Sequence, residues 1–133
     1  MYLLDTNIVS YWMRGDPIVI ERLKSHSPSD LALSSITLAE IWYGIEKSPV
    51  KKRERRSKID NISNLLTLYL FDELSARSYA IIRTQLENDG VPISERDTQI
   101  AAIAVANNLV LVAHNVKEFR RIGQLKVEDW AVG

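Results

Sequence analysis

Short apolar runs recur along this chain and are separated by longer segments with helical periodicity. Residues 109–113 are apolar at every position, which favours a central parallel strand covered on both faces. The other predicted strands lie at residues 2–4, 31–34, 68–71 and 126–127. Because strands and helices alternate, the sequence predicts a three-layer α/β/α domain with a central, mainly parallel sheet of about four to five strands.

Helices are predicted in the intervals between these strands. Asp16 and Pro17 are a typical N-cap and first helical residue, and Thr37 with Glu40 fits a capping box. Residues 100–106 are apolar throughout, which indicates a helix buried on all sides. The remaining predicted helices cover residues 6–14, 17–26, 50–66, 75–88 and 117–122, and one more starts at Thr37.

The composition is typical of a soluble globular protein, with 46% hydrophobic and 26% charged residues in a chain of 133. We expect a single domain over residues 1–133. The chain has no cysteine, which excludes disulfides, thiolate catalysis and cysteine-bound zinc. No apolar run has the length of a membrane span and no signal-peptide pattern opens the sequence, so we expect a cytoplasmic protein without a membrane partner.

The net charge is zero, but the basic residues are unevenly distributed. Residues 47–58 contain seven lysines and arginines against the single acid Glu54. One interpretation is a solvated helix face. The other is a phosphate-contacting patch in which Arg53, Arg55 and Arg56 contact RNA or a protein partner.

Three acidic residues lie at predicted junctions between elements. Asp5 directly follows the first strand, Glu40 follows the second within a turn of helix, and Asp97 precedes the wholly apolar helix. The carboxyl ends of parallel strands meet in one crevice of an α/β fold. Carboxylates gathered there repel one another unless a cation lies between them, which predicts a Mg²⁺ or Mn²⁺ site.

Each acid also has a simpler explanation as part of a helix cap. Asp5 can be the N-cap of the first helix, Glu40 can complete the Thr37 capping box, and Asp97 can do the same for Ser94. The three together favour the metal site, because acids close to a protein interior need a counter-charge. Spacing alone does not prove that they converge.

Further polar residues lie beside these junctions. Thr6 and Asn7 are expected to hydrogen-bond to Asp5, to a metal-bound water or to a substrate phosphate. Asn115 can offer a neutral oxygen, and Glu118 can reach the same region. His114 is a poor candidate, because hard oxygen sites rarely use imidazole. His26, beside a helix end, needs no functional role.

Four blocks of the sequence resemble the signatures of the PIN-domain family, in order and at the family's separations. They are Leu4-Asp5-Thr6-Asn7, Thr37-Leu38-Ala39-Glu40, Asp97-Thr98-Gln99-Ile100-Ala101-Ala102 and Asn115-Val116-Lys117-Glu118-Phe119. The segment Leu125-Lys126-Val127-Glu128-Asp129-Trp130 resembles the tail of the VapC toxins of type II toxin–antitoxin systems. The resemblance covers essentially the whole chain.

The resemblance implies a Mg²⁺- or Mn²⁺-dependent endoribonuclease that acts as a toxin, with Asp5, Glu40 and Asp97 as catalytic and metal-binding acids. It also implies a VapB-type antitoxin, a homodimer and an RNA substrate, by analogy the anticodon region of tRNA. Asn115 stands where the family commonly has a fourth acid, and Glu118 follows it. A degenerate PIN-like module that binds RNA or protein without turnover is the alternative. A receiver-type domain is disfavoured, because Asp5 has no acidic neighbour.

Overall fold

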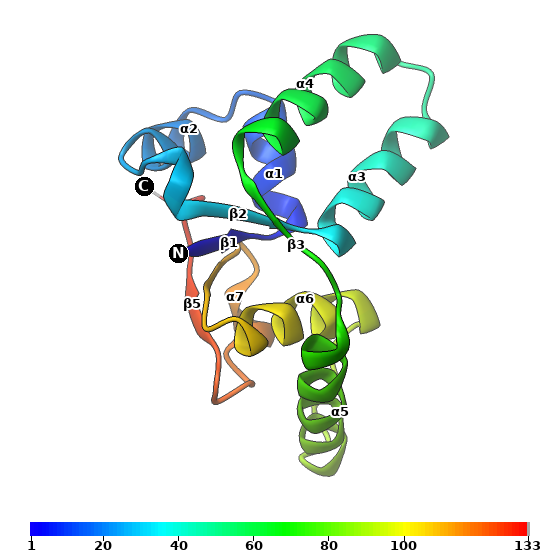
Figure 1. Ribbon diagram of the computed structural model, residues 1–133, viewed down its shortest axis with the longest axis vertical. Helices are drawn as coiled ribbons and strands as arrows, with labels where there is room; N and C mark the ends of the chain where they lie inside the picture. The colour runs from blue at the N-terminus through cyan, green and yellow to red at the C-terminus, as the bar shows by residue number, and fades with distance from the viewer. Residues whose placement is uncertain (133) are drawn as a thin grey trace.

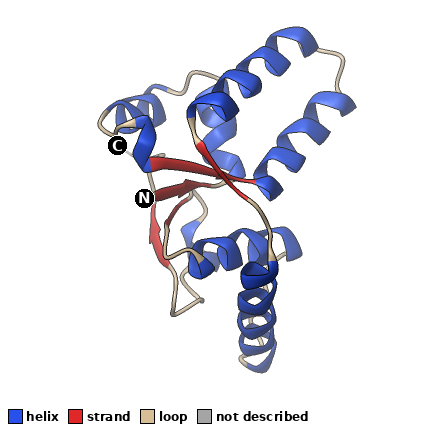
Figure 2. Ribbon diagram, viewed as in Figure 1, coloured by secondary structure: helices blue, strands red, loops and turns tan. Residues whose placement is uncertain are grey.

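The sheet of the protein is entirely parallel. The structure is a computed structural model and describes residues 1–132. Its five strands lie in the order β3-β2-β1-β4-β5, and each neighbouring pair is parallel (Figure 2). The strands are β1 (Tyr2–Leu4), β2 (Leu31–Ser34), β3 (Thr67–Tyr69), β4 (Val110–Val112) and β5 (Lys126–Glu128). The predicted fold class is therefore confirmed.

Helices cover both faces of this sheet (Figure 1). One layer contains α1 (Thr6–Met13), α2 (Pro17–Lys24), α3 (Ser35–Lys47) and α4 (Lys52–Leu65), and the other contains α5 (Glu73–Asn88), α6 (Glu95–Ala106) and α7 (Val116–Phe119). A 3-10 turn, Pro28–Asp30, precedes β2. No helix within residues 1–132 is long and apolar enough to cross a bilayer.

Each layer has its own hydrophobic core. Successive side chains of a strand point to opposite faces, so Leu3 and Leu111 pack against α5 and α6 while Leu4 and Val112 pack against α1 to α4. Residues 100–104 of the apolar part of α6 are buried, as the sequence predicted, whereas Val105 and Ala106 are partly exposed. Burial on both faces explains why the central strands contain almost no polar residues.

The strand order reverses direction at β1. The chain moves from β1 outward to β2 and β3 on one side, then returns to β4 and β5 on the other. In open parallel sheets such a reversal leaves a crevice beyond the carboxyl ends of the strands. Asp5 is the first residue after β1, so the fold places it at this crevice.

The start of α3 differs from the prediction. Ser34, the last residue of β2, is the N-cap, and its Oγ accepts a hydrogen bond from the Thr37 backbone N–H at 3.0 Å. The helix therefore begins at Ser35, and the capping box expected for Thr37 and Glu40 is wrong. One serine both ends the strand and caps the helix, so the Glu40 carboxylate is not used as a cap.

Candidate active site

Asp5 is fixed by both the sheet and a helix. Its backbone N–H donates to the Val112 carbonyl at 2.9 Å, which extends the β1–β4 ladder by one residue. Its Oδ1 accepts from the Ile8 N–H at 3.0 Å, so Asp5 is the N-cap of α1. The side chain is only 4% exposed. Capping therefore accounts for one carboxylate oxygen and leaves the second available for another role.

The ionisation of Asp5 is strongly perturbed. Burial raises the pKa of the Asp5 carboxyl to about 7, and the Ile8 N–H bond only partly opposes this. The charges of Asp97 and Glu40 raise the pKa further, which shows that the three acids lie within electrostatic reach of one another. A cation bound beside Asp5 would reverse the effect, because it favours the charged form.

Glu40 links three helices at the crevice. The Thr6 hydroxyl at the start of α1 donates to Glu40 Oε1 at 2.6 Å, and the Thr6 and Thr37 hydroxyls are 3.2 Å apart. On the other side Arg96, in the first turn of α6, lies 3.6 Å from Glu40 Oε2. Thr6 thus orients the carboxylate of Glu40, a contact that the sequence did not predict, and its expected role towards a metal-bound water or a phosphate stays a prediction.

Asp97 lies in the first turn of α6 and is half-buried. Its backbone N–H donates to Ser94 Oγ at 3.2 Å, which is one half of the capping box expected for Ser94 and Asp97. Burial raises the pKa of the Asp97 carboxyl, a hydrogen bond with the Ser94 side chain partly opposes this, and the charges of Glu118 and Glu40 raise the pKa further. Glu118 is therefore close to the acids, as its position three residues after Asn115 suggested.

The other predicted residues are less tightly held. Asn7 and Asn115 are exposed, and Asn115 precedes α7 without a side-chain capping bond. His114 Nδ1 lies 3.3 Å from Asp129, and the His114 ring packs edge-on against Tyr11. These contacts give no indication that His114 is a metal ligand. His26 stacks on Trp130, with ring centroids 4.5 Å apart. A metal or substrate role for Asn7 and Asn115 stays a prediction.

The donors gathered here fit a hard divalent cation. Asp5, Glu40 and Asp97 offer only carboxylate oxygens, the ligands that Mg²⁺ and Mn²⁺ prefer. Within residues 1–132, however, no three acidic or histidine side chains are close enough to hold one ion as they lie. Glu40 is turned towards Thr6 and Arg96, so this side chain must rotate for a shared ion to be ligated.

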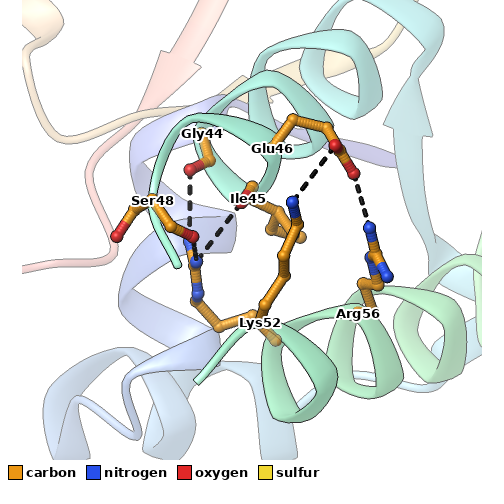
Figure 3. A network of polar contacts seen from close by, with 7 residues as sticks. Gly44, Ile45, Glu46, Ser48, Lys52 and Arg56 are labelled. Carbon is orange, nitrogen blue, oxygen red and sulfur yellow. Dashed lines mark hydrogen bonds and ion pairs between the residues drawn. The ribbon is translucent and has the colours of Figure 1, made fainter. Parts of the chain in front are cut away.

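Several side chains of the basic segment bind other groups of the α3–α4 hairpin, which is residues 35–65. The Arg55 guanidinium donates to the carbonyls of Gly44, Ile45 and Ser48 at the end of α3 (Figure 3). Its Nε also donates to the Val50 carbonyl. Lys52 and Arg56 both pair with Glu46, at 3.2 and 2.7 Å. Arg55 therefore stabilises the α3–α4 connection, while RNA or partner contact by Arg53, Arg55 and Arg56 stays a prediction.

Two hollows lie beside Glu40. One of about 610 Å³ lies among α1, α3 and α4, and another of about 440 Å³ lies between α3 and α6. Both are lined by Thr6 and Glu40. Sequence reasoning did not identify Arg96, which lines the smaller hollow. Its position directly before Asp97, at the start of an apolar helix, was the available signal.

Comparison with known proteins gives a consistent result over the whole chain. The PIN domain family matches residues 2–125. Ribonuclease VapC2 of Rickettsia felis is 39% identical over 98% of both chains, and the tRNA(fMet)-specific endonuclease VapC of Shigella flexneri is 31% identical over 98% of both. The crystal structure of VapBC2 from Rickettsia felis, bound to a promoter DNA fragment, contains a similar chain, with a TM-score of 0.87, 37% identity and coverage of 97% and 98%.

Proposed function

This chain belongs to the PIN-domain family and to its VapC ribonucleases, and from that premise we propose that it is the ribonuclease toxin of a toxin–antitoxin pair and requires Mg²⁺ or Mn²⁺. The observation that carries the proposal is the crevice formed by Asp5, Glu40 and Asp97. Asp5 caps α1, Glu40 lies on α3 and Asp97 on α6, and the pKa values of Asp5 and Asp97 are raised by burial and by the charge of Glu40. Buried acids with raised pKa values are typical of functional sites.

The reaction is hydrolysis of an RNA phosphodiester bond. A divalent ion held by Asp5, Glu40 and Asp97 would act as a Lewis acid that offsets phosphate charge and makes water a stronger nucleophile at neutral pH. Asp5 or Asp97 orients the attacking water and accepts its proton on a carboxylate oxygen. Water oxygen bonds to phosphorus as the bond to the 3′-oxygen breaks, which leaves a 5′-phosphate and a 3′-hydroxyl.

The proposed substrate is tRNA, cut in the anticodon region. A relative that is 31% identical over nearly the full length is a tRNA(fMet)-specific endonuclease, which supports this class of substrate. An anticodon loop also presents unpaired nucleotides, and unpaired bases are the part of a structured RNA that proteins read. Because the net charge is zero, attraction of RNA depends on local basic groups rather than on the charge of the whole molecule.

The proposed partner is a VapB-type antitoxin that blocks the site, and the toxin itself is proposed to form a homodimer in the cytoplasm. Similar chains, at 37% and 32% identity, are found in VapBC complexes from Rickettsia felis and Salmonella typhimurium. The alternative of a binding module without turnover is not supported, because the relatives matched over nearly the whole chain are ribonucleases.

The test is cleavage of a tRNA mixture by purified protein, with Mg²⁺ or with EDTA. Wild type should cut only with the metal, and the new ends should be a 5′-phosphate and a 3′-hydroxyl. Asp97→Asn should cut at least about 100-fold more slowly, the usual scale of losing an acid–base group. Asp60→Asn, an exposed acid on α4, is the matched control and should retain wild-type activity. Cleavage in EDTA, or by Asp97→Asn at the wild-type rate, would contradict the proposal.

A further inference from the structure

The smaller hollow beside the acids contains three different kinds of recognition group. Tyr43, Arg96 and Gln99 supply an aromatic ring, a cation and an amide. Its apolar lining comes from Ile36 and Ala39. These groups come from the facing helices α3 and α6, which are in contact. A cation, a flat ring and an amide together match the phosphate, the base face and the base edge of one nucleotide.

Tyr43 presents its ring one helical turn from a proposed catalytic acid. It follows Glu40 by three residues on α3, so both side chains lie on the same face of the helix. The side chain is 61% exposed, unlike most aromatic residues of this protein. Lys47, one turn further along, lies over the ring with Nζ 5.8 Å from its centroid. An exposed ring with a nearby cation is a stacking surface for an unpaired base.

Arg96 is held in the same hollow by a single weak contact. Its guanidinium lies 3.6 Å from Glu40 Oε2, and its side chain is 66% exposed. Such an exposed ion pair contributes little in water, so the guanidinium can leave Glu40 for a phosphate, to which it can donate two parallel hydrogen bonds. Gln99 lies one turn after Arg96 on α6 and lines the same hollow.

We propose that this hollow binds the unpaired nucleotide adjacent to the scissile bond, with its base stacked on Tyr43 and its phosphate bound by Arg96. Because Thr6 and Glu40 also line the hollow, a nucleotide bound there lies beside Glu40, one of the three acids. This inference rests on the proposed ribonuclease function. It adds specificity-determining residues, since the hollow selects an unpaired base over one stacked in a duplex.

The first experiment measures binding separately from cleavage. In an Asp5→Asn background, which we expect not to cut, the Kd of a short fluorescent single-stranded RNA is measured by anisotropy. Tyr43→Ala should weaken binding by roughly 5- to 150-fold, the fold-change expected for losing one base stack. Tyr43→Phe keeps the ring and should keep the affinity. A double-stranded RNA of the same sequence should bind equally to all three proteins.

The second experiment tests the phosphate contact in the same background. Arg96→Ala should weaken binding and reduce the log–log salt dependence by about 0.7, the value of one phosphate contact on a single strand. Arg77→Ala is the matched control, because Arg77 is also exposed and forms one surface ion pair, with Glu73. Its affinity and salt dependence should equal those of the parent protein.

Three outcomes overturn the inference. Equal RNA affinity for Tyr43→Ala and Tyr43→Phe would remove the stacking role, and equal salt dependence for Arg96→Ala and Arg77→Ala would remove the phosphate contact. Unchanged RNA affinity together with a dimer lost on size exclusion would assign the hollow to a second copy of the chain. Failure of the proposed function is distinguishable, because wild type would then cut no RNA while the binding differences persisted.

Discussion

The acidic crevice and the basic hairpin both contain many charged groups, but the environments of these groups differ. At the crevice, burial and mutual repulsion raise the pKa values of Asp5 and Asp97. In the α3–α4 hairpin, four of the seven cations of residues 47–58 already bind other groups, since Arg55 binds carbonyls and Lys52, Arg56 and Lys58 bind Glu46 or Glu54. The dense charge visible in the sequence is thus exposed and partly paired, whereas the dispersed acids are buried and repel one another. Perturbed ionisation, rather than charge density, indicates the reactive site.

The largest expected effect is a difference in cleavage rate between variants of two glutamates on α3. Glu40→Gln is expected to slow RNA cleavage by at least about 100-fold, because it removes a charge from the crevice. Glu46→Gln removes an equal charge from the hairpin, where Glu46 only pairs with Lys52 and Arg56, and should leave cleavage unchanged. Initial rates on a labelled tRNA measure both. An equal loss of cleavage rate in the two variants would mean that the charge of Glu40 has no specific role in catalysis.

The next effect is on stability and depends on pH. The folded-state pKa of Asp5 is about 7 and the ordinary value is 3.8, so the wild-type protein should lose stability as pH rises from about 4 to about 7. Asp5→Asn keeps an N-cap acceptor and removes this loss. In EDTA at pH 8 the variant should be more stable by roughly 1–4 kcal/mol, with little difference near pH 4.

Urea unfolding at several pH values gives this difference directly, with Asp60→Asn as the control of equal charge change. Added Mg²⁺ at pH 8 should stabilise wild type but not Asp5→Asn, since an ion that binds only the folded state raises its stability. A constant difference across the pH range would show that the Asp5 carboxyl titrates normally.

A third effect tests whether the hairpin uses Arg55 for structure. Arg55→Ala should reduce the free energy of unfolding by about 1–3 kcal/mol, because this guanidinium on α4 binds carbonyls at the end of α3 and in the turn that follows it. Arg53→Ala, an exposed neighbour, should change stability by less than about 0.5 kcal/mol. A hairpin that loses RNA affinity but no stability on Arg55→Ala would instead be a phosphate-binding surface.

The smallest effect concerns the edge of the crevice. If Glu118 supports a bound cation, Glu118→Gln should shift the Mg²⁺ dependence of cleavage to higher concentration, and Asn115→Asp should shift it lower by adding a charge. We expect shifts of about 10-fold, the low end for groups outside the first ligands. Metal titrations of cleavage with both variants measure this. Curves that coincide with wild type would limit the acidic site to Asp5, Glu40 and Asp97.

The sequence predicted the sheet and the acids for identifiable reasons. Residues 109–113 had to be a buried strand because no polar position interrupts them, and Asp5 had to lie at the carboxyl edge because it follows the first strand. The start of α3 was missed because Ser34 and Thr37 are both good caps, and only the geometry of β2 chooses between them. The role of Arg55 could not be predicted, because it binds backbone carbonyls, which every residue has whatever its type.

The hollow that Arg96 shares with Tyr43 was missed for another reason. It depends on how α3 packs against α6, a relation between distant segments that periodicity does not specify. Residue type gave no help either, since exposed arginines and tyrosines are common on helix surfaces. Local signals therefore located the acids, whereas the groups that surround them required the packed helices.

The pairing of β1 with β4 has a consequence for the order in which a ribosome makes this toxin. Asp5 emerges early, but its backbone bond to Val112 and its neighbour Asp97 belong to the last third of the chain. Because synthesis adds only about 5–20 residues per second, the N-terminal half spends seconds without the strand that completes its sheet. The crevice is thus assembled only after Asp97 and β4 have been made, so a chain interrupted before them lacks part of the acidic crevice.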